Sequence, residues 1–579
     1  MSPQIVGDRN AEALKEAASW PGADRATLVV LATVLAATGA DQEGAEYFET
    51  LAASQPDQVL PQALAGYFQV RAGEDIPSGI AKLDDAASRD LGPSQYYRGL
   101  ALAELPASAG HAEQAIADLE FVLAVRDQFP SNMIRAAYHG LATAYAAAGR
   151  DEMAAEAAQA SGLSSAPAQT RLEFGSGWMS AAEGFHMATP RITEVSPGIQ
   201  VAQSYDFGDF AFVRTDAGVV AIDAGTAPHR VRAALAAAGI DPGDISHVIL
   251  THAHFDHAGG ISALTGPATT VIAQAGFPAE LQRQHGNAFP FRSFTGEGAG
   301  FGDGHADGKP AEIAVDQLIA ERTSLSIGGT EFVLYPAKGG ETSDALMVYL
   351  PASGVLFAGD VMMPYLGAPF FAEGSPAGML DVLALIAEIA PRELVHGHVV
   401  LTEVFTTETI PGLVRALTEL RDESLARIRR GQTLTQVLDV NLLPESLREH
   451  PVAVAPFLVI RDHFVQRLYQ QHSGYWQPDG SGLEPVSEAE RAAALDLLAE
   501  GKPERFADAA RVLIEQRDAA LALEIATAGL TRHPQNADLS RLRREALYRL
   551  MERHQLQDPF RFLIYGELAG VELGPVASA

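Results

Sequence analysis

The spacing of apolar positions divides the chain into three kinds of segment. Residues 10 to 162 are rich in alanine, and their apolar positions recur at helical spacing, with glycine breaks between successive helices. From about residue 190, β-type runs such as FAFVRTDAGVVAIDAG and HVILTHAH alternate with helix-like stretches such as HRVRAALAAAG. After about residue 408 the pattern returns to helices. Strands that alternate with helices predict a layered α/β architecture for the middle of the chain.

These changes predict four parts. We expect a helical domain over residues 1–165, a linker rich in Ser, Gly and Pro over 166–189, an α/β domain over 190–407 and a second helical domain over 408–579. The run IRAAYHGLATAYAAAGRDEMAAEAAQASG repeats a helix, a glycine break and a helix. It resembles the tetratricopeptide pattern of about 34 residues per repeat, although an irregular helical domain fits it equally well. No ionisable cluster in this first domain suggests chemistry, so packing or partner binding is expected.

Composition and charge narrow the class of protein. Of the residues, 47% are hydrophobic and 20% are charged, which is ordinary for a globular chain. A net charge of −32 argues against nucleic acid as a partner, because phosphate binding needs clustered Lys and Arg. The sequence contains no run of eighteen apolar residues, so no membrane-spanning helix is expected. The start, MSPQIVGDRNAEALKEAAS, lacks a signal-peptide pattern, so a cytoplasmic location is expected; a processed secreted or periplasmic form would look the same.

The chain has no cysteine, and this limits its chemistry. Disulfides, thiolate metal sites and cysteine nucleophiles are all excluded. Any metal must be held by His, Asp and Glu, a set that suits zinc, iron or manganese.

The stretch VILTHAHFDHAGG places three histidines and an aspartate directly after an apolar strand. Loops at strand ends are where binding groups collect. The alternate residues His252 and His254 can face one cation, while the adjacent Asp256 and His257 turn toward a second. A surface histidine tract is the alternative, but the flanking residues are of a buried type. The pattern therefore indicates metal binding.

Four ligands rarely complete two metal sites, so further donors are expected at later strand ends. Three segments offer them. AKGGETSDALMVYL has Glu341 in a Gly-rich turn, GVLFAGDVMM ends a strand with Asp360, and ELVHGHVVLTE ends another with His396 and His398.

This arrangement resembles the metallo-β-lactamase superfamily, and GVVAIDAG, with Asp223, matches the early strand and turn of that superfamily. Most members have a histidine where this chain has Glu341, a substitution found in the alkylsulfatase group. The region from about 410, including RIRRGQTLTQVLDVNLLPESL, is similar to the helical dimerisation domain of that group. The resemblance covers roughly residues 190 to 575. It implies an αββα sandwich flanked by two mainly α-helical domains, and a homodimer.

The resemblance also implies two divalent cations, with zinc expected and iron or manganese as alternatives. The implied ligands are His252, His254 and Glu341 for the first cation, and Asp256, His257 and His398 for the second, with Asp360 bridging. His396 is the nearest rival of His398.

Charge indicates what such a centre does. Two divalent cations contribute four positive charges, three carboxylates remove three, and a bridging hydroxide removes the fourth. A centre of this kind lowers the pKa of bound water enough to supply hydroxide near pH 7, so hydrolysis is expected. The candidate catalytic residues are Asp256 and Tyr365. Together with Phe370 and Phe371, Tyr365 could instead wall a hydrophobic substrate pocket or belong to the core.

The expected substrate is a sulfate ester of a hydrophobic alcohol. Alkylsulfatases hold sulfate with an Asn and an Arg-rich segment after the bridging acid, whereas VMMPYLGAPFFAEGSPAG contains no arginine. Arg283 and Arg292 could replace them as anion holders, or be solvated loop charges. A lactone, amide or phosphoester is therefore an alternative substrate. A non-catalytic scaffold and a di-iron redox enzyme are alternatives of other classes.

Overall fold

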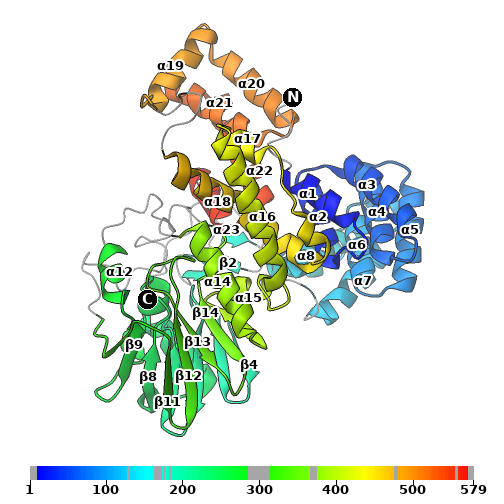
Figure 1. Cartoon of the computed structure of the whole chain (residues 1–579). Helices are drawn as coiled ribbons and strands as arrows, with labels where there is room; N and C mark the ends of the chain where they lie inside the picture. The colour runs from blue at the N-terminus through cyan, green and yellow to red at the C-terminus, as the bar shows by residue number, and fades with distance from the viewer. Residues whose placement is uncertain are drawn as a thin grey trace. The chain divides into compact units, whose positions relative to one another are not determined.

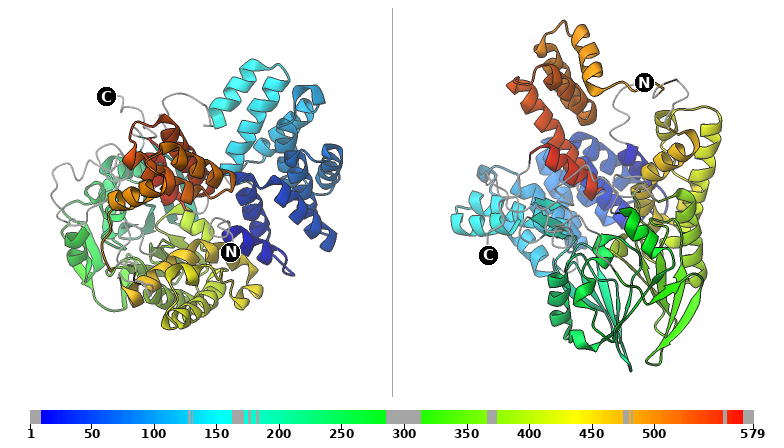
Figure 2. Two further views of the ribbon diagram at one scale, coloured as in Figure 1. Left: turned by 90° about the horizontal axis from the view of Figure 1, so that it is seen from above. Right: turned by 90° about the vertical axis from the view of Figure 1, so that its left-hand side faces the viewer.

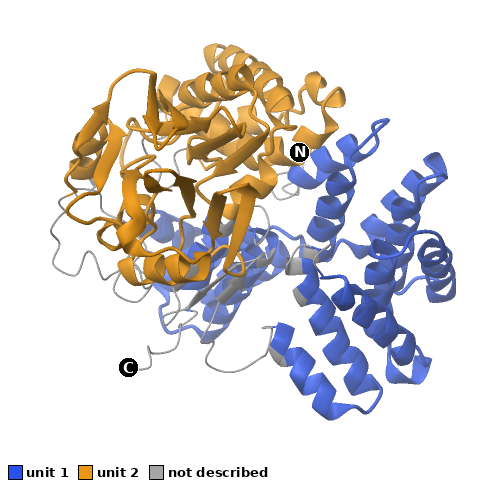
Figure 3. Cartoon of the chain, turned by 90° about the horizontal axis from the view of Figure 1, so that it is seen from below, with its two compact units in different colours: residues 1–176, 486–572 blue, residues 177–485, 573–579 orange. Residues whose placement is uncertain are grey.

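The computed structural model describes residues 9–126, 129, 131–161, 172–174, 177–180, 184–284, 313–365, 374–474, 480, 483–554 and 558–570 (Figure 1). Its contacts divide the chain into two compact units (Figure 3). The first unit joins residues 1–176 to residues 486–572, and the second comprises residues 177–485 with 573–579. The first unit is thus built from two segments far apart in the sequence. The four-part division expected from the sequence stays a prediction.

The first unit is mainly helical. Consecutive helices pack on one another, as the pairs α3 with α4, α6 with α7, and α21 with α22 illustrate (Figures 1 and 2). Phe506, Ala510 and Leu539 belong to the core of its later helices. The tetratricopeptide-like repeat stays a prediction. The helices are α1 (Arg9–Ala18), α2 (Arg25–Ala37), α3 (Asp41–Ser54), α4 (Val59–Ala72), α5 (Ile76–Arg89), α6 (Pro93–Ala103), η2 (Ala107–Ala109), α7 (Ala112–Ala124), α8 (Ser131–Ala147), α9 (Asp151–Ser161), α19 (Glu488–Leu498), α20 (Pro503–Glu515), α21 (Ala519–Arg532), α22 (Ala537–His554) and α23 (Pro559–Leu568).

Two sheets form the centre of the second unit. The first has the strand order β10-β9-β8-β7-β6-β5-β4, antiparallel from β4 to β7 and parallel from β7 to β10. The second has the order β11-β12-β13-β14-β15, with only β14 and β15 parallel. The strands are β4 (Arg191–Ser196), β5 (Ile199–Gln203), β6 (Phe210–Thr215), β7 (Gly218–Ile222), β8 (Ile245–Ile249), β9 (Thr270–Gln274), β10 (Gln317–Ile319), β11 (Thr323–Ile327), β12 (Thr330–Pro336), β13 (Leu346–Leu350), β14 (Val355–Gly359) and β15 (Glu393–His396). Three short strands, β1 (Leu172–Phe174), β2 (Gly177–Ser180) and β3 (Gly184–His186), precede them.

Alternation along the strands explains why the sheets stack. On β7, Val220 and Ile222 join the core between the two sheets, whereas Val219 and Ala221 face the other side. That outer core contains Val231 and Leu235 of α10 (Pro228–Ala238). Successive strand residues point to opposite faces, so a strand buried on both faces reads as an unbroken apolar run.

Helices complete the layers. Helix α10 packs on the outer face of the first sheet, and α14 (Pro376–Ile389) and α15 (Val399–Val404) lie beside the second (Figures 1 and 2). The predicted αββα sandwich is therefore present. The other helices of this unit are η4 (Pro242–Asp244), α11 (Phe255–Ala258), η5 (Ile261–Ala263), α12 (Phe277–Gln284), α16 (Ile410–Arg429), α17 (Leu434–Leu438), η7 (Glu445–Arg448), η8 (Pro451–Ala453) and α18 (Val454–Ser473). Among the described residues, no helix has the length and apolar content needed to cross a bilayer.

Candidate metal centre

Strand ends deliver the predicted donors to one edge of the sandwich. Strand β8 runs into the loop that carries His252 and His254, and the one-turn helix α11 presents Asp256 and His257. Asp360 directly follows β14, and His398 lies two residues after β15. The connection from β12 to β13 supplies Glu341. Parallel strands end at a common edge, which is where α/β folds place their sites.

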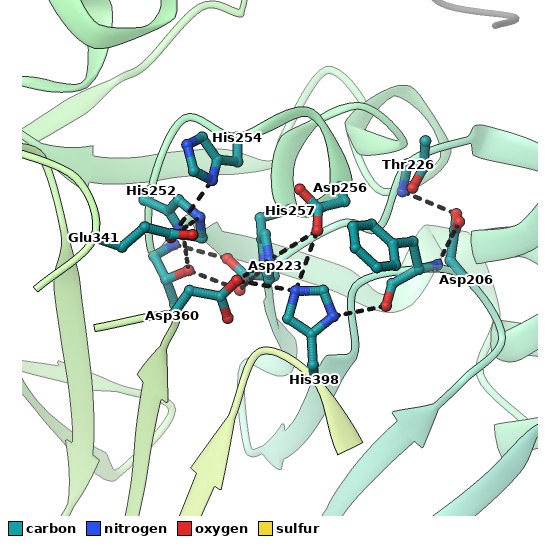
Figure 4. Close-up of polar contacts among 12 residues, drawn as sticks. Asp206, Asp223, Thr226, His252, His254, Asp256, His257, Glu341, Asp360 and His398 are labelled. Carbon is teal, nitrogen blue, oxygen red and sulfur yellow. Dashed lines mark hydrogen bonds and ion pairs between the residues drawn. The ribbon is translucent and has the colours of Figure 1, made fainter. Parts of the chain in front are cut away.

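Three of these side chains form the first site. His252 Nε2 lies 3.2 Å from Glu341 Oε2, and His254 Nδ1 lies 3.4 Å from the same oxygen (Figure 4). All three side chains offer a ligand atom within 4.8 Å of the others. All seven donors are buried, and His254 is the most exposed of them, at 8%.

The other four form the second site, which comprises Asp256, His257, Asp360 and His398. His398 Nε2 lies 2.9 Å from Asp360 Oδ2 and 3.3 Å from Asp256 Oδ2. His257 Nε2 lies 3.4 Å from each of those two oxygens. Each residue of the second site is at least 95% buried.

These separations fit a bound cation. Zinc held at about 2.0–2.1 Å by N and O ligands in a tetrahedron sets neighbouring donors about 3.3 Å apart. Moreover, His252 Nε2, His257 Nε2 and Asp360 Oδ1 are buried with no hydrogen-bond partner among the described residues. Buried polar atoms normally have partners. The chemistry and spacing of the donors therefore suit two divalent cations.

Asp223 orients His257 directly, and His252 through Thr251, by hydrogen bonds on the side of each ring that faces away from the centre. Its carboxylate accepts a hydrogen bond from His257 Nδ1 at 2.9 Å and one from Thr251 Oγ1 at 2.8 Å. Because Thr251 Oγ1 donates to Asp223, it accepts from His252 Nδ1 at 3.0 Å. A phenylalanine carbonyl, Phe207 O, accepts from His398 Nδ1 at 2.9 Å. The rings of His252, His257 and His398 thus carry a proton on Nδ1 and turn Nε2 toward the centre, the orientation that metal ligands require.

Electrostatics also favour positive charge at the second site. Burial lowers the pKa of His398, but Asp360 and Asp256 outweigh it and raise that pKa to about 10. Burial likewise opposes a charge on His257, yet Asp256, Asp360 and Asp223 raise its pKa well above the ordinary range. At neutral pH the carboxylates therefore draw either protons or cations to this site, and a metal ion held by these residues would displace those protons.

The first site is different. Burial, with His257 and His254 nearby, lowers the pKa of His252 well below the ordinary range. His252 is therefore neutral at pH 7, and this is the form that binds a metal.

The remaining predicted site residues lie apart from these two sets or outside the described residues. His396 Nε2 donates to Phe405 O at 3.0 Å, and burial lowers the pKa of His396 to about 4. The structure thus places His398, and not His396, beside Asp256 and Asp360. Tyr365 packs edge-on against His463 of α18, with ring centroids 5.4 Å apart. Its catalytic role, like the ligand roles, stays a prediction.

Of the two predicted anion-binding arginines, the structure describes only Arg283. Arg283, near the end of α12, forms an ion pair with the buried Glu280, and its side chain is 41% exposed. Arg292, Phe370 and Phe371 lie outside the described residues.

Sequence reasoning missed several supporting residues. The sequence indicates Asp223 only as part of a strand motif, yet the residue has a left-handed φ of 62°, a conformation in which a residue other than glycine often signals a functional site. Asp206 and Thr251 are both buried and are further supporting residues. Asp223 and Thr251 directly follow apolar runs, which is the signal that the sequence offers for them. Asp206, in contrast, follows Ser204 and Tyr205 and carries no such signal.

Comparison with known proteins identifies the families of two segments of the chain. Residues 206–398 match the metallo-beta-lactamase superfamily, and residues 433–561 match the alkyl sulfatase dimerisation family. A hydroxyacylglutathione hydrolase of Rhodobacter capsulatus is 29% identical over 155 residues, which are 27% of this chain and 48% of that protein. A linear primary-alkylsulfatase of Pseudomonas sp. is 22% identical over 326 residues, or 49% of this chain and 59% of that protein. The chain thus spans about half the length of these relatives.

Solved structures show the same fold. The stereoselective inverting sec-alkylsulfatase Pisa1 from Pseudomonas sp. superposes with a TM-score of 0.53 at 18% identity, over 66% of each chain. At that identity the likeness establishes the fold alone. The chain therefore carries a metallo-β-lactamase domain followed by an alkyl sulfatase dimerisation domain, and its resemblance to the alkylsulfatase-like branch is confirmed.

Proposed function

We propose that this chain is a metal-dependent hydrolase with a two-cation centre, and that it cleaves the sulfate ester of a hydrophobic alcohol. Zinc is the proposed metal, with iron or manganese as alternatives. The observation that carries the proposal is the convergence of seven His, Asp and Glu side chains into two sets of ligand geometry. The similarity to a linear primary-alkylsulfatase supports the sulfate ester.

Bound divalent cations would lower the pKa of a water molecule and polarise the ester oxygen. The chain's own residues prepare that chemistry. Asp223 and Phe207 O keep the Nδ1 protons of His257 and His398 in place, so the rings cannot turn away. Asp256 uses Oδ2 to face His257 and His398, and this leaves Oδ1 to accept a proton from the attacking water.

A second candidate keeps the centre and changes the substrate to a lactone, amide or phosphoester. Two observations favour it. Arg283, one of the two predicted anion holders, is engaged by the buried carboxylate of Glu280, so its charge is already compensated. In addition, one relative is named a hydroxyacylglutathione hydrolase, and the group in that name is an acyl group and not a sulfate ester. A sulfate monoester would need strong cationic donors beside the metals.

One set of assays tests both candidates. Purified protein is loaded with zinc, its metal content is measured by mass spectrometry, and hydrolysis of dodecyl sulfate, a γ-lactone and a phosphodiester is followed. We expect about two metals per chain and activity on dodecyl sulfate. Glu341→Gln should lower kcat/KM by about 100-fold or more, because losing a ligand costs at least as much as losing a ligand's hydrogen-bond partner. Glu331→Gln, an exposed change on β12, is the matched control and should leave activity intact.

The other outcomes separate the remaining hypotheses. Activity on the lactone or the diester alone would replace the sulfatase by the second candidate. Fewer than one metal per chain would favour a non-catalytic scaffold. Iron-dominated protein that consumes oxygen would favour a redox enzyme.

A further inference from the structure

We propose that Asp206 is a positioning residue that sets the second site through Phe207 and His398. The inference rests on the proposed metal centre. It adds Asp206, which is not one of the seven proposed ligands, to the residues that shape that centre. Asp206 lies just before β6 and is fully buried. It forms an ion pair of 2.9 Å with Arg230 of α10, which is also buried.

The carboxylate of Asp206 holds two stretches of backbone together. Oδ1 accepts the backbone N–H of Phe207 at 2.8 Å and Nη1 of Arg230 at 2.9 Å. Oδ2 accepts the backbone N–H groups of Thr226 at 2.8 Å and Ala227 at 3.0 Å (Figure 4). The loop before β6 is thereby fixed to the start of α10, and four donors depend on one carboxylate.

The fixed loop then contacts a ligand. The carbonyl of Phe207 accepts the hydrogen bond of His398 Nδ1 at 2.9 Å, as the chain of dashed lines in Figure 4 shows. The Phe207 ring also lies against that histidine, with ring centroids 4.7 Å apart. The residue that Asp206 immobilises therefore decides both the direction and the tautomer of His398.

The next two residues contact the backbone of the same site. A side chain at Gly208 would overlap the carbonyl oxygen of Asp256, so the loop lies directly against α11 at this point. The backbone N–H of Asp209 donates to Gly397 O at 2.6 Å, immediately before His398. Residues 206–209, which we call the positioning loop, therefore touch the segments that bear Asp256 and His398. These contacts join the positioning loop to His398, to the backbone of Asp256 and to Gly397, all within the second site, so the effect should be selective for that site.

The hydrogen-bonding pattern of Asp206 determines which substitution tests its role. A carboxylate accepts hydrogen bonds at both oxygens, whereas an amide presents one acceptor and one donor. In Asp206→Asn, the amide N–H₂ must therefore face either the pair Thr226 and Ala227 or the pair Phe207 and Arg230, all of which are donors. The positioning loop is expected to shift, and with it the Phe207 carbonyl.

The experiment measures stepwise zinc affinity by competition with a chromophoric chelator, on the full chain. By the first and second zinc we mean the ions of the first and second site, whichever binds earlier. For Asp206→Asn we expect the first zinc to bind as in the unchanged protein and the second to bind about 10- to 100-fold more weakly, the usual effect of removing support from a ligand. The double variant Asp206→Asn with Arg230→Met leaves no unpaired buried guanidinium and guards against failure to fold. It should show the same selective loss.

Asp118→Asn is the matched control. Asp118 is 1% exposed and binds Arg98 through two hydrogen bonds of 2.7 Å, but it belongs to the other compact unit. It should lower thermal stability and leave both zinc affinities unchanged.

The outcomes are distinguishable. If the unchanged protein does not bind two zinc ions, the proposed two-cation centre fails. If the unchanged protein binds two zinc ions, and both Asp206 variants bind the second zinc as tightly as the unchanged protein does, the positioning role is wrong. Equal weakening by Asp118→Asn, or weakening of both zinc ions, would also overturn it, because the effect would then be general destabilisation.

Discussion

At the scale of the residue, the centre depends on which nitrogen of each histidine carries the proton. Asp223 engages Nδ1 of His257 directly and reaches His252 through Thr251. One carboxylate therefore serves both proposed sites, since His252 belongs to the first and His257 to the second. Such supporting contacts matter because a rotated or wrongly protonated imidazole cannot offer its lone pair to a metal.

Two histidines two residues apart give a residue-level test. His398→Ala should weaken the second zinc by more than about 100-fold, since it removes a proposed ligand and not merely a ligand's partner. His396→Ala should retain both zinc ions and cost about 2–4 kcal/mol of stability, because it empties a buried position and strands the Phe405 carbonyl. Metal titration and thermal unfolding of the two variants check this. Loss of zinc in the His396 variant would reverse the assignment.

The candidate metal ligands could be predicted from the sequence, but the residue that positions them, Asp206, could not. The donors His252, Glu341, Asp360 and His398 could be predicted because each follows an apolar strand and has ligand chemistry. The contacts of Asp206 could not, since its partners are backbone N–H groups of Thr226 and Ala227, which no residue type reveals. Its ion pair with Arg230 spans 24 residues and follows no periodic pattern.

At the scale of the element, strand ends determine the site. The parallel pairing of β14 with β15 brings Gly359 opposite His396, so the residues that follow both strands emerge together. A layered α/β architecture could be predicted from the alternation of strand and helix patterns, whereas the αββα sandwich was implied only by the resemblance to the metallo-β-lactamase superfamily. The pairing of residues 1–176 with 486–572 could not, since helical spacing does not say which helices share a core.

Gly397 gives a prediction at this scale. It separates β15 from His398, and a methyl group there would overlap Asp360 Oδ1 and lie 2.5 Å from His257 Cε1. Gly397→Ala should therefore weaken the second zinc about 10-fold or more, an effect similar in size to losing a supporting contact. Gly266→Ala is the matched control, because the nearest atom to its added carbon is 3.8 Å away. Zinc affinities measured side by side would contradict the prediction if the two variants matched.

At the scale of the whole molecule, metal removal should act on one unit. Ligand bound only to the folded state adds about 4 kcal/mol of stability at 1,000 times its Kd. We therefore expect a chelator to lower the unfolding temperature of residues 177–485 by on the order of 10 °C, at roughly 2–4 °C per kcal/mol. The transition of the helical unit should stay in place. Calorimetry with and without chelator checks this, and an equal shift of every transition would contradict it.

Assembly gives the last prediction. The alkyl sulfatase dimerisation match over residues 433–561 leads us to expect a homodimer. Within that range, Leu497 and Leu498 of α19 are 82% and 77% exposed, and large apolar side chains on a surface favour association. Light scattering should give twice the chain mass, and Leu497→Glu with Leu498→Glu should shift it toward the monomer. Glu488→Gln, exposed on the same helix, is the control. A monomer at micromolar concentration before any substitution would refute the dimer.

The division of the helical unit between distant segments has a consequence for biosynthesis. Helix α2 meets α22, and Arg517 donates to the carbonyl of Gly39, so the early helices await partners from the far end of the chain. At about 5–20 residues per second, a ribosome needs on the order of tens of seconds to translate what separates them. During that interval the early helices lack these partners, whereas the last strand of the sandwich, β15, is translated before residues 486–572.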